Sequence, residues 1–135
     1  MRSIARRFVP KSDLKRELER LVLESKIQAG VLLSLVGSLS NAALRAAGGS
    51  AVLKLEGPLE IVAGTGTFAS DGTMHVHLCV ADSTGRVQGG HLMPGCTILT
   101  TAEVVIGDLS SELHFSRQLD ETTGHLEFVV RNLAN

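Results

Sequence analysis

Aromatic side chains are scarce in this sequence. Of its 135 residues, four are Phe and none is Trp or Tyr. Proteins that read single-stranded nucleic acids usually stack bases on exposed aromatic rings, so this composition disfavours that class of protein. Cysteine is also sparse, with Cys79 and Cys96 as the two thiols. Two are too few for a disulfide framework, and we therefore expect free, partly buried thiols in a reducing, cytoplasmic environment.

Long apolar runs are lacking too. The longest, residues 31–36, suits a buried strand and is too short to cross a bilayer. The basic residues at the N-terminus are not followed by an apolar stretch, so we expect neither a signal peptide nor a membrane partner. Hydrophobic residues nevertheless make up 44% of the chain and charged residues 20%, which is typical of a globular protein. The length fits a single domain over residues 1–135.

The spacing of the apolar residues predicts a helix first and strands afterwards. Leucines recur at helical spacing between Ser12, the expected N-cap, and Gly30, the expected helix end. A turn at 37–41 is expected to lead into a short helical segment at 42–44. From residue 51 onward the chain predicts strands joined by turns. In the next-to-last strand, Leu113, Phe115 and Leu119 are expected to point inward. In the last strand, Leu126, Phe128 and Val130 are expected to form the apolar face.

Three of the five histidines lie close together in the sequence: His75, His77 and His91. His75 and His77 alternate with apolar residues in an expected strand, so both project from one face. Their Cα atoms would be roughly 6.5–7 Å apart, which lets two imidazoles bind one cation at about 2.0–2.1 Å. The Gly89-Gly90 pair allows the backbone to approach closely before His91. This pattern indicates a three-histidine metal site, whereas an isolated His in a strand is more often only hydrogen-bonded or solvated.

Four segments together carry a more specific signal than any single motif. They are Leu59-Glu60-Ile61, Gly72-Thr73-Met74-His75-Val76-His77-Leu78, Gly85-Arg86-Val87-Gln88-Gly89-Gly90-His91-Leu92 and Thr100-Thr101-Ala102-Glu103-Val104-Val105-Ile106. In combination they resemble the PPC domain, the plant- and prokaryote-conserved domain. The upstream passage Lys26-Ile27-Gln28-Ala29-Gly30 is similar to that family as well, so the resemblance extends over nearly the whole chain.

The resemblance implies an α+β fold. In it, a curved, mainly antiparallel sheet packs against one long N-terminal helix and one short helix, an architecture shared with acetolactate decarboxylase, a zinc lyase. It also implies a homotrimer. His75, His77 and His91 match the metal-binding histidines of the family, with Zn²⁺ the usual ion and another divalent metal possible. Cys79 shares the strand face of His75 and His77 and is an alternative fourth ligand.

Plant members of the family join the domain to an AT-hook, an Arg-Gly-Arg-Pro core that enters the minor groove of DNA. No such motif occurs in this sequence. Basic residues concentrate near the N-terminus, where Arg6, Arg7 and Lys11 are the candidates for contact with DNA phosphates. Neighbouring acidic residues favour the alternative that this region is simply a solvated surface.

Two functional classes remain open, because a fold does not fix a function. The first, which we prefer, is a stand-alone prokaryotic protein of this family: a homotrimeric, metal-binding module with a regulatory or DNA-associated role. The second is a metal-dependent enzyme of the lyase or hydrolase type that acts on a small molecule. Three protein ligands with an open fourth position are the pattern of catalytic zinc and would favour the enzyme.

An enzyme would also need a group that transfers protons, and Glu103 is the candidate. The alternative for Glu103 is structural, with its carboxylate accepting a hydrogen bond from a ligand histidine and fixing that ring. Arg86 is a candidate for binding an anionic substrate, although an Arg after a turn is more often solvated. His114 and His125 lie on other expected strands and are expected at the surface, outside the site.

Overall fold

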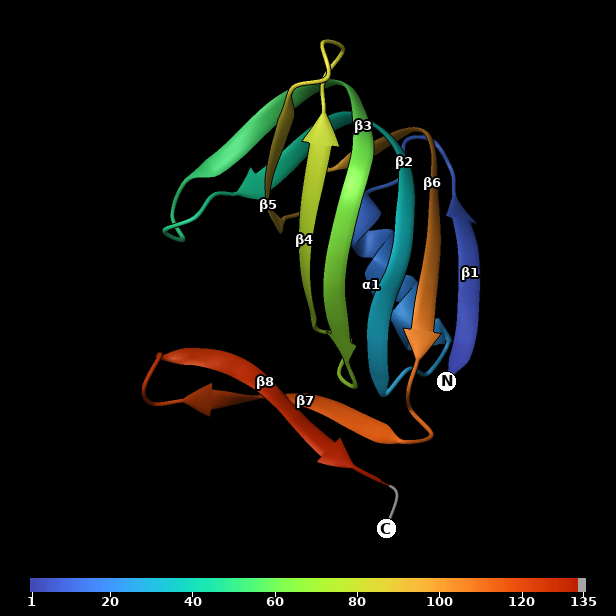
Figure 1. The fold of residues 1–135 in the computed structure, drawn as a ribbon, viewed down its shortest axis with the longest axis vertical. Coiled ribbons are helices and arrows are strands. Elements are labelled where there is room, and N and C mark those ends of the chain that lie inside the picture. The colour runs from blue at the N-terminus through green and yellow to red at the C-terminus, as the bar shows by residue number, and fades with distance from the viewer. Residues whose placement is uncertain (134–135) are drawn as a thin grey trace.

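The structure is a computed structural model that describes residues 1–133. Its elements, in chain order, are β1 (Arg2–Phe8), α1 (Leu14–Glu24), β2 (Ala29–Arg45), β3 (Val52–Ala69), β4 (Met74–Ala81), β5 (Val87–Leu92), β6 (Thr97–Asp108), β7 (Leu113–Asp120) and β8 (His125–Asn132) (Figure 1). Six strands form one antiparallel sheet in the order β1-β6-β2-β3-β4-β5, and β7 pairs with β8 in a separate two-stranded sheet. Within the described residues, no helix is long and apolar enough to span a membrane.

The helix α1 begins and ends with recognisable caps. Asp13, not the expected Ser12, is the N-cap, because its carboxylate accepts a hydrogen bond from the Arg16 N–H at 3.1 Å. At the other end Lys26 adopts a left-handed conformation, with φ at 56°. The Ile27 N–H then bonds to the Val22 carbonyl at 3.1 Å, which closes a Schellman turn. The helix therefore ends well before Gly30, which lies in β2.

The expectation of an α+β fold with a long and a short helix was wrong. Helix α1 has only 11 residues, and in the part of the chain that the structure describes no second helix follows it. The segment expected to be helical, 42–44, belongs to β2, where Ala42, Ala43 and Leu44 pair with residues of β3. Long-range pairing along a 17-residue strand overrides the weak local helix preference of alanine and leucine. The fold is instead β-rich, with one helix on one face of the sheet (Figure 1).

The hydrophobic core lies between α1 and the inner face of the sheet. The helix contributes four buried residues: Leu14, Leu18, Leu21 and Val22. The alternating pattern of β4 contributes Val76, Leu78 and Val80, which join the same cluster. The residues between them in β4, including His75 and His77, therefore project from the opposite, outer face of the sheet. Burial of the apolar half of β4 is what directs the two histidines outward.

The β7–β8 hairpin crosses one end of the large sheet (Figure 1). It is attached there by backbone hydrogen bonds, from Phe115 N–H to the Gln28 carbonyl at 2.9 Å and from Ser70 N–H to the Phe115 carbonyl at 3.0 Å. The expectation that Phe115 points inward is confirmed, since it is buried. The same expectation for Leu119 was wrong, because that side chain is 67% exposed. The hairpin extends beyond the hydrophobic core, and Leu119 lies on the part that the core does not reach.

Candidate metal site

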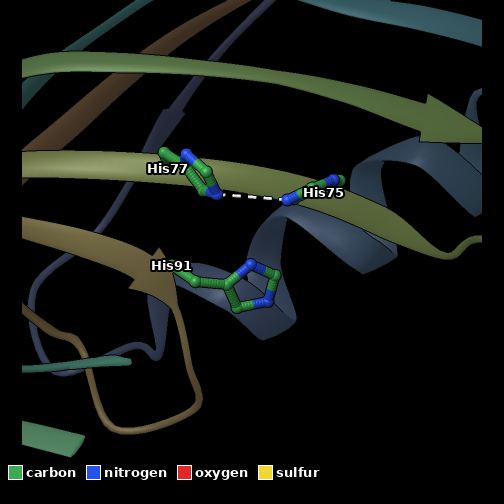
Figure 2. A group of neighbouring side chains, drawn as sticks. All are labelled: His75, His77 and His91. Carbon is green, nitrogen blue, oxygen red and sulfur yellow. Dashed lines mark hydrogen bonds between the residues drawn. The ribbon is translucent and has the colours of Figure 1, made fainter. Parts of the chain in front are cut away.

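The three histidines meet on the outer face of the sheet (Figure 2). His75 and His77 belong to β4, and His91 belongs to the neighbouring β5, where it is the direct register partner of His77. The Nε2 atoms of His75 and His77 are 3.1 Å apart. One ring nitrogen from each histidine lies within 4.8 Å of the others. The gathering of three histidines predicted from the sequence is therefore present in the fold.

The separations of the ring nitrogens suit a single small cation. Two ligands bound tetrahedrally at about 2.0–2.1 Å lie roughly 3.3–3.4 Å from each other. The His75–His77 pair is already near that separation, at 3.1 Å. The ring nitrogen of His91 lies within 4.8 Å of both. The described chain supplies three candidate ligands at this point, and Cys79, which is half-buried and free, is outside the cluster.

The Gly89-Gly90 pair explains how β5 reaches this position. A Cβ atom at Gly90 would lie 2.5 Å from the Arg45 carbonyl oxygen, and one at Gly89 would lie 2.9 Å from the Cys79 sulfur. Both contacts are too short for a side chain. Strand β5 fits between β4 and the end of β2, with Arg45 as a further register partner of His91. The expectation of a close backbone approach before His91 is confirmed.

Replacing Gly90 by Ala is therefore expected to weaken metal binding. The added methyl group would collide with backbone, so β5 must shift, and His91 follows immediately in the chain. Displacement of a residue that supports a metal site typically costs 10–100-fold in affinity, and we expect a loss of at least about tenfold. Gly64→Ala is the matched control, since its Cβ would meet only side-chain atoms at 3.4–3.5 Å. Competition with a coloured zinc chelator measures the zinc affinity of both variants. Equal zinc affinities for Gly90→Ala and Gly64→Ala would contradict this prediction.

Two of the three imidazoles are held in the uncharged form. Burial lowers the pKa of His91 to about 4, and the positive charge of Arg45 acts in the same direction. The pKa of His75 is also lowered, mainly by burial and then by the neighbouring charges of His77 and Arg117. Only a neutral imidazole can ligate a metal, so both rings are ready to do so at neutral pH.

One atom of the cluster lacks a hydrogen-bond partner in the described part of the chain. The Nδ1 atom of His91 is buried, and among the described residues it makes no hydrogen bond. A buried polar atom without a partner destabilises a protein by about 1–3 kcal/mol. Such an atom beside two other imidazole nitrogens fits a site that binds a cation. The donor set and the orphaned nitrogen are thus both compatible with a metal ion.

The other expected site residues lie elsewhere in the chain. Glu103 is an exposed residue of β6, beside Arg7 on β1, and β2 and β3 separate it from the histidine strand. A role for Glu103 beside the histidines therefore stays a prediction, and one that a second copy of the chain would have to fulfil. Arg86 is exposed in the turn after β4, at the end far from His75.

The DNA-contact candidates lie at the opposite edge of the sheet from the histidines. Arg6 and Arg7 are exposed on the edge strand β1, and Lys11 is exposed just after it. The Arg7 guanidinium is already engaged, because it donates hydrogen bonds to the Thr101 hydroxyl at 3.0 Å and to the Thr100 carbonyl at 3.1 Å.

A cavity of about 520 Å³ adjoins the histidine cluster on the side of the β7–β8 hairpin. It is lined by His75 and His91 and by three residues that sequence analysis did not connect with them: Arg45, Arg117 and His125. His125 is exposed, as expected, but it faces the cavity rather than lying apart from the site. Arg45 arrives through the β2–β5 pairing and Arg117 through the hairpin, and neither arrangement leaves a signal in the local sequence.

A β-rich sheet carrying three neighbouring histidines on its open face defines a class of histidine-cluster protein suited to metal binding. Within that class, this chain belongs to the Plants and Prokaryotes Conserved (PCC) domain family, whose model matches residues 1–110. The family expected from the sequence motifs is therefore confirmed.

The chain is also similar to part of a much longer protein. It is 51% identical over 128 residues to the bifunctional protein GlmU of Synechococcus sp. (strain JA-3-3Ab), a match that covers 95% of this chain and 20% of that protein. The chain thus spans about a fifth of the length of the curated relatives it matches. The expectation of a stand-alone protein remains a prediction.

Solved structures share the fold over almost the full chain. A hypothetical protein from Salmonella enterica is 36% identical, with a TM-score of 0.92 and coverage of 98% of this chain and 94% of that one. The metal-containing protein AF0104 of Archaeoglobus fulgidus is 26% identical, with a TM-score of 0.79 and coverage of 96% and 94%. A candidate DNA-binding protein of Bacteroides thetaiotaomicron is 20% identical, with a TM-score of 0.83 and coverage of 94% and 91%.

Proposed function

We propose that this chain is a metal-binding module in which His75, His77 and His91 hold one divalent ion. The observation that carries the proposal is the convergence of three ring nitrogens within 4.8 Å. Imidazole nitrogen suits Zn²⁺ and other late divalent ions, and Zn²⁺ is the ion we favour. The Archaeoglobus protein, which shares the fold at 26% identity and is described as metal-containing, supports the binding of a metal by this chain.

Elemental analysis of untagged protein tests this function. After incubation with zinc and removal of the excess, about one ion per chain is expected at pH 7. Because the pKa values of His75 and His91 are lowered, these rings stay neutral below the ordinary histidine value of about 6.5. Protons therefore compete with zinc at His91 only as the pH falls toward about 4, the pKa of that ring. At His75, where burial also lowers the pKa, they compete only below the ordinary histidine range. Protein that retains no zinc at pH 7 would contradict the proposal.

We further propose that the module is a homotrimer, as the family resemblance implies. Large apolar side chains stand exposed in the single chain, on the strands away from the core and on the hairpin: Leu33, Val36, Val62 and Leu119 are each at least 48% exposed. Exposed apolar surface of this extent is commonly covered by association. Light scattering is expected to give a mass near three times 14.3 kDa. A stable monomer at micromolar concentration would contradict the assembly.

An association with DNA is the regulatory role that the structural neighbours suggest. The candidate DNA-binding protein of Bacteroides shares the fold, and in this chain Arg6, Arg7 and Lys11 would supply the phosphate contacts. Arg6 and Arg7 are consecutive in β1, so their side chains leave opposite faces. This arrangement and a net charge of −1 favour weak, non-specific binding.

Titration with duplex DNA at two salt concentrations measures this contact. We expect dissociation constants no tighter than the non-specific range of about 10⁻⁴–10⁻⁶ M, weakening steeply with salt because counterions are released. Arg6→Ala combined with Lys11→Ala should reduce the salt dependence, while Lys54→Ala, on the far strand β3, should not. Tight binding that depends on the DNA sequence would instead make DNA recognition the main function.

A metal-dependent enzyme of the lyase or hydrolase type is the second candidate, and the cavity of about 520 Å³ beside His75 and His91 favours it. When bound, a zinc ion supplies a water molecule of lowered pKa and polarises carbonyl oxygens. Within the cavity, Glu127 and His125 are the groups able to accept or donate a proton.

A further inference from the structure

The cavity beside the histidine cluster contains two arginines from different parts of the fold. Arg45 is the last residue of β2, and Arg117 lies in the middle of β7. Both line the cavity together with His75 and His91, while Met74 and Leu126 supply apolar wall. A volume of about 520 Å³ falls within the roughly 300–1,000 Å³ of sites for small molecules.

Arg45 is fixed next to the histidines by strand pairing. It is the register partner of His91 in the β2–β5 pair, and its side chain is half-buried. Arg45 and His91 both line the cavity, as their pairing in neighbouring strands requires. Among residues 1–133 the Arg45 guanidinium takes part in no ion pair.

Arg117 is positioned from the other side of the cavity. Its guanidinium donates a hydrogen bond to the Thr67 hydroxyl at 3.3 Å, and Thr67 is the register partner of His75. The same group lies 5.5 Å from the centroid of the Phe128 ring, a cation–π distance. Arg117 is half-buried and, within the described chain, has no carboxylate partner.

The residues that line the cavity carry a net positive charge, because two half-buried guanidinium groups stand against one carboxylate, and neither guanidinium forms an ion pair with it. Glu127 is the one acidic residue among those that line it, and its carboxylate already accepts a hydrogen bond from the Thr123 hydroxyl at 2.9 Å. Buried charge is destabilising unless a partner compensates it. The planar fork of an arginine matches the oxygens of carboxylate and phosphate groups. An oxyanion is therefore the ligand group that completes this cavity.

We propose that the cavity binds a small organic anion whose carboxylate or phosphate group pairs with Arg45 and Arg117, while the other end of the molecule reaches the ion held by the three histidines. The proposal rests on the metal site proposed above. The apolar walls formed by Met74 and Leu126 suit a short aliphatic body between the two ends of the ligand. The ligand is thus held at two points. The arginines bind its negatively charged group, and the ion held by the histidines binds an oxygen atom at its other end.

Calorimetric titration of zinc-loaded protein with succinate, with inorganic phosphate and with uncharged succinamide tests the proposal. Saturable binding is expected for at least one of the two anions and none for succinamide. The preference between succinate and phosphate identifies the oxyanion. Arg45→Gln and Arg117→Gln are each expected to weaken binding at least tenfold while zinc content is unchanged. Arg86→Gln, at an exposed turn beyond the far end of β4, should bind like the wild type.

Zinc content, measured for every variant, separates the two proposals. If wild-type protein retains no zinc, the metal site fails, and anion binding that is still lost in both Gln variants supports the arginine site by itself. If either Gln variant does not fold, Arg45→Lys and Arg117→Lys replace them. These keep the charge but lose the fork, and an intermediate loss of affinity is expected. Absence of saturable anion binding, or equal affinity in wild type and arginine variants, would overturn the proposal.

Discussion

Removing zinc with a chelator is expected to lower the melting temperature of the wild-type protein strongly, and His77→Ala should abolish that difference. An ion that binds only the folded chain stabilises it by RT ln(1 + [L]/Kd), or about 4.1 kcal/mol when the free ion is 1,000 times Kd. His77 contributes one of the two nitrogens that already lie 3.1 Å apart. Its loss leaves two ligands, too few for a closed or a catalytic zinc site.

The measurement is a thermal melt of wild-type and variant protein in zinc-buffered and in chelator-containing solution. His114→Ala is the control, because His114 lies on β7 and is not part of the cluster. The control should keep the full zinc-dependent shift. A wild-type melting temperature that does not respond to zinc, or a His77→Ala protein that responds like the wild type, would rule out these histidines as the ligands.

Leu18→Ala is expected to cost about 2–5 kcal/mol in the free energy of unfolding. Leu18 is fully buried at 0% exposure, on the face of α1 that packs against the sheet. Truncation leaves a cavity that the rigid sheet behind it cannot close. The control is on the same helix, since Leu23 is 56% exposed, and Leu23→Ala should stay within roughly 0.5 kcal/mol.

Denaturant unfolding in the presence of chelator compares the two leucine variants without a contribution from the metal. Both should be measured at the same protein concentration, so that any association affects them equally. Similar losses from Leu18→Ala and Leu23→Ala would mean that α1 does not pack in the way the structure indicates.

Patterns over a few neighbouring residues correctly predicted the features of the fold that depend on local geometry. The helical spacing of Leu14, Leu18 and Leu21 identified the buried face of α1. Strand alternation placed His75 and His77 on one face, and the glycine pair marked the approach of the third histidine. These features depend on neighbours within a few residues, which is why they can be read from the sequence.

Features that depend on distant pairing were missed. Residues 42–44 resemble a helix locally, but they form a strand because β3 pairs with them. Arg45 joins His91 only through the β2–β5 contact, and Arg117 joins the cavity only because the hairpin crosses the end of the sheet. Contacts between residues so far apart leave no pattern in the spacing of residues along the sequence. The candidate metal ligands were therefore predictable, whereas the groups that surround them were not.

The double pairing of β5 has a consequence for insertions and deletions. This strand is hydrogen-bonded to β4 on one side and to the end of β2 on the other, so it cannot slide along one neighbour without breaking from the second. A slip of one residue would also turn every side chain of β5 to the opposite face. A deletion within Gly89-Gly90 would therefore not simply move His91 by a few ångströms; it would direct the imidazole into the core. The number of residues between the β4–β5 turn and His91 therefore cannot change by one, in either direction, without removing His91 from the cluster.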